Sequence, residues 1–237
     1  MRKTAKDILI KAILPKIANN FIKIHHYSKK VVPNSKIHFG IFYNKKLEGV
    51  MQFGSPTDKK KIHPVVKNTK WNGMLEINRL AFTDILPKNS ESRALSICMK
   101  IIKKKYSHIE WILSYADATQ CGDGTIYRAM GFVLTSIKKN TGLRINPKTK
   151  EIIHSIQAHH LMFQREWQKW EAITGFQLRY IYFFKKTDIN RLTVPILPYK
   201  KIYEMGAGMY KGVRVLKKGA ENQSAIGGAS PTHSLHT

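Results

Sequence analysis

The chain contains 237 residues, 43% of them hydrophobic, which is enough for one sizeable globular domain. Its formal net charge of +26 repels itself unless a polyanion neutralises it, so we expect nucleic acid as a partner. Two cysteines exclude a disulfide framework and the lack of a long apolar stretch excludes a membrane span, so we expect a cytoplasmic protein.

Helical spacing of apolar residues predicts a first helix at residues 4–20, begun by a capping box and kinked at Pro15. A polar loop with His26 and Tyr27 follows. The next expected elements are a hairpin of strands at 36–43 and 47–54, a basic loop at 55–72, a strand at 74–83 and a helix from 89 to about 105.

The chain is organised around residues 110–132. The apolar run at 111–113 predicts a buried strand that ends in the polar residues Ser114 and Asp117. A glycine-rich loop, a short helix that carries Tyr127, and the start of another strand follow. Ligands of α/β sheets gather at the carboxyl ends of strands, so we expect these three polar side chains to face a common cleft.

The second half of the chain predicts mainly strands. They are expected at 132–137 and 176–185, with a turn-rich loop at 140–150, an ambiguous segment at 152–164, a helix at 165–173 and extended chain at 192–200. We expect one domain at 1–218, with a basic C-terminal extension from about residue 176, and a disordered tail at 219–237.

Asp117 and Tyr127 each admit two interpretations. An aspartate after a strand and before a glycine loop is a general base or metal ligand, or a residue that only makes a turn. Tyr127 is a general acid or cofactor contact, or it only packs the short helix on the sheet.

Charged residues inside the strand at 74–83 need a partner or a ligand. Strict alternation puts Glu76 and Asn78 on one face and Arg79 on the other. Arg79 suits a carboxylate or phosphate group. Together with Asp117 and Glu76, one of the neighbouring histidines His25 and His26 makes a set of His and carboxylate ligands that suits a divalent metal such as iron, although a single histidine in a loop is more often only solvated.

Lysines are dense in two stretches that we expect to contact nucleic acid. Each lysine taken singly is ordinary solvated surface, but tyrosines interleaved with the second stretch suit base stacking. The lysines concerned are Lys59, Lys60, Lys61, Lys67, Lys70, Lys200 and Lys201.

Several separated blocks resemble known families. TIYRAMGF is similar to the segment of GNAT-type acyltransferases in which a tyrosine precedes a Gly-Phe at the next strand. HHYSKK, EINRLAFTD, PKNSES, LSYADATQCGDGTIYRA and LPYKK, spread over residues 24–201 in this order, resemble the Mom family of phage DNA-modification proteins. The resemblance implies a GNAT-like α/β (α+β) fold, with a central mixed, mostly antiparallel sheet flanked by helices.

The same resemblance implies an enzyme. Mom-like proteins convert adenine in double-stranded DNA to an N6-carbamoylmethyl-type derivative, which protects phage DNA from host restriction, and they are described as iron-dependent. Carried over by motif, it implies catalytic roles for Tyr27, Ser114, Asp117 and Tyr127, cofactor or substrate contacts for Arg79, Ser114 and Tyr127, and metal ligation by His26 and Asp117. A phage-encoded protein of this kind works in the cytoplasm of the bacterial host.

Two alternatives stay open. One is an acetyl-coenzyme A-dependent GNAT N-acetyltransferase, although the loop LPKNSES lacks the glycines that normally hold the pyrophosphate. The other is a basic nucleic-acid-binding protein without catalysis. The sequence specifies neither the donor of the added group nor the oligomeric state, and a homodimer is compatible with it.

Overall fold

The computed structural model describes residues 4–160, 162–210 and 212–214, so the predicted tail at 219–237 lies outside it. Its strands are β1 (Leu9–Ala12), β2 (Ser35–Tyr43), β3 (Lys46–Gly54), β4 (Met74–Phe82), β5 (Trp111–Asp117), β6 (Val133–Ile145), β7 (Ile152–His154), β8 (Glu171–Phe183), β9 (Met209–Tyr210) and β10 (Val213–Arg214). Its helices are α1 (Pro15–His25), α2 (Lys59–Ile62), α3 (Ser90–Lys105), α4 (Thr125–Ala129), α5 (Ser155–His160), α6 (Gln164–Trp167) and α7 (Lys200–Glu204), with 3-10 turns η1 (Ala5–Asp7), η2 (His63–Val65) and η3 (Lys186–Arg191).

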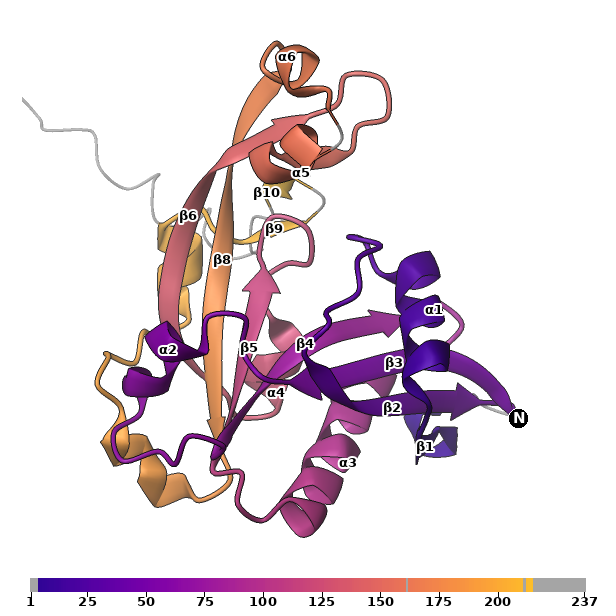
Figure 1. The fold of residues 1–237 in the computed structure, drawn as a ribbon, viewed down its shortest axis with the longest axis vertical. Helices are drawn as coiled ribbons and strands as arrows, with labels where there is room; N and C mark the ends of the chain where they lie inside the picture. The colour runs from indigo at the N-terminus through magenta and orange to yellow at the C-terminus, as the bar shows by residue number, and fades with distance from the viewer. Residues whose placement is uncertain (1–3, 161, 211, 215–237) are drawn as a thin grey trace, which may run out of the picture.

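One sheet of eight strands runs through the molecule in the order β1-β2-β3-β4-β5-β8-β6-β7 (Figure 1). The β4–β5 pair is parallel and the other neighbouring pairs are antiparallel. This mixed, mostly antiparallel sheet with flanking helices confirms the predicted fold class. The stretch from Phe176, where we expected a C-terminal extension to begin, lies inside β8, between β5 and β6.

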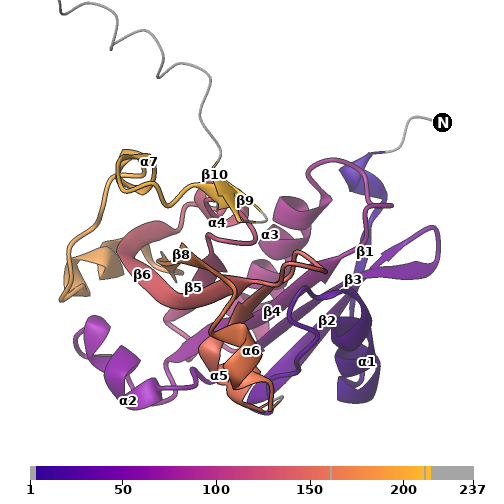
Figure 2. The ribbon, with the colours of Figure 1, turned by 90° about the horizontal axis from the view of Figure 1, so that it is seen from above.

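Helices cover both faces of the sheet (Figure 2). On one face α3 buries the apolar stripe that its sequence predicts, including the fully buried Leu95 and Ile102. Burying each such side chain stabilises the fold by about 1.5–3 kcal/mol. On the opposite face α1 packs Ile22 against Val50 of β3 and Ala81 of β4. Among the described residues, no helix is both long enough and apolar enough to cross a membrane.

The first predicted helix is wrong in its first half. The capping box exists, with the Thr4 N–H donating to Asp7 Oδ2 at 3.1 Å, but it caps only the turn η1. The next residues form β1, with Leu9 opposite Phe42 of β2. Pro15 does not kink a helix, because it stands at the start of α1, where its missing N–H costs nothing.

A long projection of the sheet replaces the loop and helix expected after residue 140. β6 continues to Ile145 through the predicted turn-rich loop. The predicted helix at 165–173 is confirmed only as far as Trp167, where α6 ends, because a turn follows and strand β8 begins at Glu171. We call residues 138–173 the arm: the outer halves of β6 and β8 with β7, α5 and α6. The arm extends beyond the end of β5 (Figure 1).

Candidate active site

The site lies where the two parallel strands stop pairing. β4 and β5 pair from Met74–Trp111 to Ile77–Ser114, and no later pair joins them among the described residues. Beyond this point β5 continues to Asp117. Polar side chains can lie near this opening because the sheet no longer needs apolar cover there.

A β-bulge corrects the predicted alternation in β4. Gln52 of β3 pairs with Arg79 and the next residue, Phe53, pairs with Ile77, so Asn78 is the extra residue. A bulge shifts every later side chain to the other face. Glu76 and Arg79, predicted on opposite faces, therefore interact, and the Arg79 charge partly offsets the burial that raises the Glu76 pKa to about 7.

Asp117 both shapes a turn and faces the opening. Its Oδ1 accepts the backbone N–H groups of Thr119 at 3.0 Å and Gln120 at 3.3 Å, which fixes the carboxylate. Burial raises the pKa of Asp117, and hydrogen bonds from Thr119, Gln120 and Tyr27 act in the opposite direction. Asp117 therefore makes a turn, as one interpretation predicted, and its position also leaves the other interpretation open, in which it is a general base or metal ligand.

The loop after α1 brings His26 and Tyr27 to the same place. Arg79 holds this loop, because its Nε donates to the Lys30 carbonyl at 2.9 Å. Burial and then the Asp117 charge raise the pKa of Tyr27, so its hydroxyl stays protonated beside the carboxylate. The Tyr27 residue as a whole is 52% exposed, so it stands at the surface of the site.

His26 is neutral in this setting. Burial and the Arg79 charge lower its pKa to about 4. Its Nδ1 accepts the Ser28 N–H at 3.1 Å and lies 2.8 Å from Ser28 Oγ. A ring nitrogen that accepts an N–H carries no proton, so the imidazole proton is on Nε2.

Ser114 and Tyr127 lie on the α3 face of the sheet, and neither is among the residues that line the cleft beside Asp117, which differs from the common cleft that we expected for these three side chains. Alternation along β5 directs Ser114 with Ala116 to that face and Asp117 to the other. Burial raises the pKa of Tyr127 to about 12. The Ser114 hydroxyl is fully buried beside the Tyr127 phenol, and its interaction with that phenol lowers the Tyr127 pKa against the larger effect of burial.

Cys121 lies between Asp117 and Tyr27 on one side and Tyr127 on the other. The sequence analysis did not identify it as a site residue. Its charge interactions reach Asp117 and Tyr27 on one side and Tyr127 on the other. The Cys121 residue is exposed, but the protein atoms around its thiol and then the Asp117 charge raise the pKa of that thiol to about 12, so we assign it no nucleophilic role. A lone cysteine in a glycine loop gives no signal for this position.

A cleft of about 890 Å³ opens beside Tyr27 and Asp117. Its second wall comes from the arm, which the sequence prediction also missed. The residues that line it are Tyr27, Ser28, Lys29, Lys30, Asp117, Thr119, Gln120, Asn140, Leu143, Thr149, Lys150, Glu151, Ile152, Ile153, His154 and Gln157. Its volume lies within the range of about 300–1,000 Å³ that is usual for small-molecule sites.

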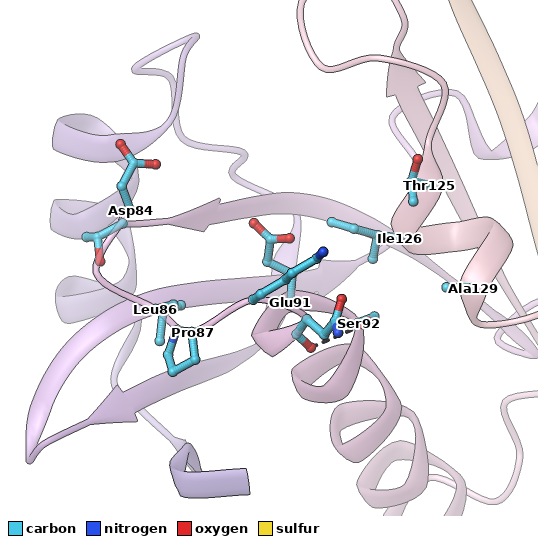
Figure 3. Close-up of a pocket in the computed structure, with 11 residues that line it drawn as sticks. Asp84, Leu86, Pro87, Glu91, Ser92, Thr125, Ile126 and Ala129 are labelled. Atoms are coloured by element: carbon cyan, nitrogen blue, oxygen red, sulfur yellow. Dashed lines mark hydrogen bonds between the residues drawn. The ribbon is translucent and has the colours of Figure 1, made fainter. Parts of the chain in front are cut away.

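A second cavity of about 340 Å³ lies at the glycine-free loop before α3 (Figure 3). Asp84, Glu91 and Lys88 line it together with residues of α4. Burial and the Asp84 charge raise the pKa of Glu91. Two neighbouring carboxylates at the start of a helix repel a pyrophosphate that the helix dipole would otherwise attract.

The proposed iron ligands do not fit a metal ion as they are arranged. Within the described ranges no three His, Cys, Asp or Glu side chains form a group that can hold one. Asp123, the carboxylate in the glycine-rich loop after β5, is not free to bind a metal either, because Arg128, Tyr203 and Thr125 all contact it.

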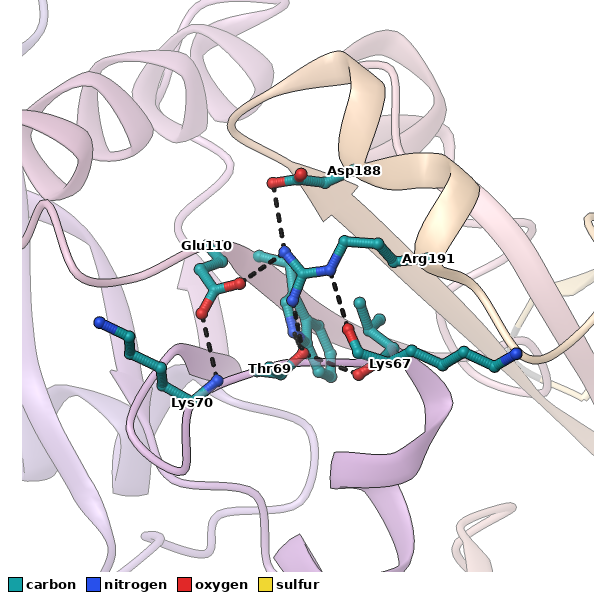
Figure 4. A network of polar contacts seen from close by, with 8 residues as sticks. Lys67, Thr69, Lys70, Glu110, Asp188 and Arg191 are labelled. Carbon is teal, nitrogen blue, oxygen red and sulfur yellow. Dashed lines mark hydrogen bonds and ion pairs between the residues drawn. The ribbon is translucent and has the colours of Figure 1, made fainter.

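The predicted nucleic-acid-binding lysines divide between two regions. α2 lies on the same side of the molecule as α1 and α5, and α7, with Lys200 and Lys201, lies away from them (Figure 2). Figure 4 shows Arg191 joined to Glu110 and Asp188, at 2.6 and 3.5 Å, and to the Lys67 carbonyl at 2.8 Å. This network fixes the backbone that carries Lys67 and Lys70 and leaves both residues exposed.

Comparisons with known proteins match most of this chain to one family by sequence. The Mom protein family matches residues 7–201. Methylcarbamoylase Mom of Escherichia phage Mu is 31% identical over 209 residues, which cover 83% of this chain and 85% of that protein.

Solved acetyltransferases are similar at the level of the chain trace. A GNAT family acetyltransferase from Elizabethkingia anophelis with acetyl-CoA bound is 14% identical over 75% of this chain and 99% of its own, with a TM-score of 0.45. The ribosomal-protein-S18-alanine N-acetyltransferase of Escherichia coli is 9% identical over 75% and 94%, also with a TM-score of 0.45. The family match and the identity to the phage Mu protein both extend over most of the sequence, and the chain therefore belongs to the Mom protein family.

Proposed function

We propose that this protein is a DNA-modifying enzyme that attaches a carbamoylmethyl-type group to the N6 amine of adenine, as the name methylcarbamoylase given to its phage Mu relative suggests. The single observation that carries the proposal is the cleft that contains Tyr27 and Asp117 in a strongly basic member of the Mom family. Protection of phage DNA from restriction is the biological outcome we infer.

The target adenine must leave the base stack to reach the cleft, because its amine is otherwise paired inside the duplex. A carboxylate at the end of a strand is placed to accept the proton that the amine loses when the new bond forms. Asp117 has this position, and its backbone hydrogen bonds hold it in one orientation. Tyr27 supports it by donating a hydrogen bond to the carboxylate.

Arg79 and the Ser114–Tyr127 pair have different roles in the proposal. Two nitrogens of the Arg79 guanidinium donate to the backbone carbonyls of Lys30 and Asn78, so Arg79 first positions the loop that carries His26 and Tyr27. The buried Ser114 hydroxyl and the protonated Tyr127 phenol, which interact with each other, are the groups we assign to the donor of the carbamoylmethyl group.

The requirement for divalent iron stays a prediction from the family resemblance. Because the described side chains do not form a ligand set, we assign no step to a metal. Chelator-treated protein, tested for DNA modification with and without added ferrous ion, decides whether iron is required.

The acetyl-coenzyme A alternative has one argument against it in this chain. The loop before α3 presents Asp84 and Glu91 to the cavity, and these carboxylates oppose binding of a pyrophosphate. A thermal-shift measurement with acetyl-coenzyme A tests this: we expect no stabilisation, and a rise in Tm that depends on coenzyme concentration would support the alternative.

The decisive experiment expresses the gene in bacteria and analyses host DNA, digested to nucleosides, by mass spectrometry. We expect a new deoxyadenosine that is heavier by one carbamoylmethyl group and that disappears in Asp117→Asn. The matched control is Asp7→Asn, which makes the same chemical change at an exposed residue in η1 and keeps the product. If the modified nucleoside persists in Asp117→Asn, Asp117 is not the base; if it never forms, the proposed function is wrong.

A further inference from the structure

The arm carries many basic residues that have no role in the function proposed above. Its basic residues are Lys138, Lys139, Arg144, Lys148, Lys150, Arg165 and Lys169, against the acidic residues Glu151, Glu166 and Glu171. Apart from Arg144, they are all exposed. An exposed excess of positive charge on a projecting element attracts a polyanion.

The arm has its own small core and so holds its shape. Ile153, Ala158 and Trp167 are buried together, with Phe163 and Trp170 packed against them. The Trp167 indole N–H donates to the Ile153 carbonyl at 2.9 Å. Arg144 is used internally, because its guanidinium lies over the Trp167 ring and donates to the Trp170 carbonyl at 2.5 Å.

Lys150 stands at a fixed point on the arm wall of the cleft. It ends the turn between β6 and β7, where its N–H donates to the Asn146 carbonyl at 2.9 Å. The side chain of Asn146 accepts the N–H groups of Lys148 and Thr149 at 2.9 and 3.2 Å. The backbone of Lys150 is left-handed, with φ of 59°, so the turn determines the direction of its side chain.

Lys29 and Lys30 stand on the opposite wall. The Lys29 N–H donates to the His26 carbonyl at 2.8 Å, its φ is 51°, and Arg79 binds the Lys30 carbonyl. Both lysines line the cleft and both are exposed. In the described part of the chain, the ion pairs of lysine use Lys61, Lys200 and Lys201, and none uses these cleft lysines.

We propose that these two walls form a clamp for the DNA backbone, with Lys29 and Lys30 on one side and Lys150 on the other, each neutralising phosphates that flank the target nucleotide. The proposal rests on the proposed function for the identity of the polyanion. The proposal gives the arm a role, because the arm brings Lys150, the second half of the clamp, to the cleft.

The test measures binding of the full-length protein to a short fluorescent DNA duplex by anisotropy at several salt concentrations. The variant is Lys29→Asn/Lys150→Asn, because asparagine is neutral and tolerates a left-handed backbone. The control is Lys103→Gln/Lys104→Gln, which removes the same charge from exposed residues at the end of α3, on the opposite face of the sheet from α1.

We expect the slope of log K against log salt to become shallower by about 2 in the clamp variant, since each lost phosphate contact accounts for about 0.9. The control, which carries the same net charge, keeps a slope near that of wild type. Lys29→Arg/Lys150→Arg restores the wild-type slope. Thermal unfolding confirms that all variants are folded.

Failure of the clamp and failure of the proposed function give different results. If the clamp variant binds with the affinity and slope of wild type, or changes only as much as the control, the clamp is wrong even when the wild type modifies adenine. If the slope falls as expected while no modified adenine forms with the wild type, the clamp stands and the proposed chemistry is wrong. Wild type that shows no salt-dependent DNA binding overturns the clamp.

Discussion

Glu76→Gln tests the electrostatics of the site through stability. Burial, opposed by Arg79 and a backbone hydrogen bond from Thr57, moves the Glu76 pKa from 4.5 to about 7 in the folded protein. The folded chain therefore holds a proton there that the unfolded chain releases above pH 4.5. This contribution to stability is complete below pH 4.5 and is lost as the pH rises through about 7.

The magnitude follows from the two pKa values. One pKa unit corresponds to about 1.4 kcal/mol, so the wild type loses about 3 kcal/mol relative to Glu76→Gln between pH 4.5 and pH 8. For a domain of this size each kcal/mol moves Tm by about 2–4 °C, which gives a relative gain of about 6–12 °C for the variant.

Thermal unfolding of both proteins from pH 4.5 to pH 8 measures this difference. Glu166→Gln, at an exposed position in α6, gives the baseline effect of removing one negative charge from a very basic protein. His26 and Asp117 are present in the wild type and in both variants, so their own titrations cancel in the comparison to first order. A Tm difference between Glu76→Gln and wild type that stays constant over this pH range refutes the argument, because it means that Arg79 fully compensates the Glu76 charge.

Two further variants test the supports of the site. Arg79→Lys keeps the charge but loses the fork that holds the Lys30 carbonyl, so we expect faster amide hydrogen exchange in residues 27–34 and a loss of about 1 kcal/mol; unchanged exchange contradicts this role. Asp123→Asn leaves the partly buried Arg128 without its counter-charge, so we expect a loss of about 3 kcal/mol in urea unfolding, and an unchanged midpoint contradicts the role of Asp123 as the anchor of α4.

Local sequence signals predicted the elements that surround the site. The hairpin, α3 and the run from β5 through the glycine loop to α4 all lie where composition and capping placed them. Gly124 shows why the loop is so well determined: its φ is 72°, and a Cβ there meets the Tyr180 ring at 2.7 Å. Only glycine satisfies both conditions without strain.

Features set by partners distant in the sequence were not predictable in the same way. Residues 9–12 have helical spacing, yet β2 offers them backbone hydrogen bonds that a helix of that length cannot match. The bulge at Asn78 depends on the register of β3. The segment Asn140-Thr141-Gly142 has turn composition, but the register of β6 against β8 shifts there and the strand continues.

The residues of the candidate site also divide into those with a local sequence signal and those placed by distant parts of the chain. Asp117 and Tyr127 were found from the local pattern of strand, loop and helix. His26 was considered only for its residue type in an ordinary polar loop, and the family resemblance then implied roles for both His26 and Tyr27. Their approach to Asp117 depends on Arg79, whose side chain reaches the loop only because the bulge turns it to that face. Neither the arm wall of the cleft nor Cys121 carries a local signal.

The charges of the cleft couple binding to chemistry. A DNA phosphate that approaches Asp117 favours the protonated form of its carboxyl, and burial already raises the Asp117 pKa. A base must be ionised to accept the proton of the adenine amine, so DNA binding alone would weaken catalysis. Lys29, Lys30 and Lys150 at the mouth of the cleft counter this effect, because they neutralise the phosphates next to the carboxylate. In the proposed clamp, the same lysines that hold the DNA would therefore keep Asp117 in the ionised form that the proposed reaction needs.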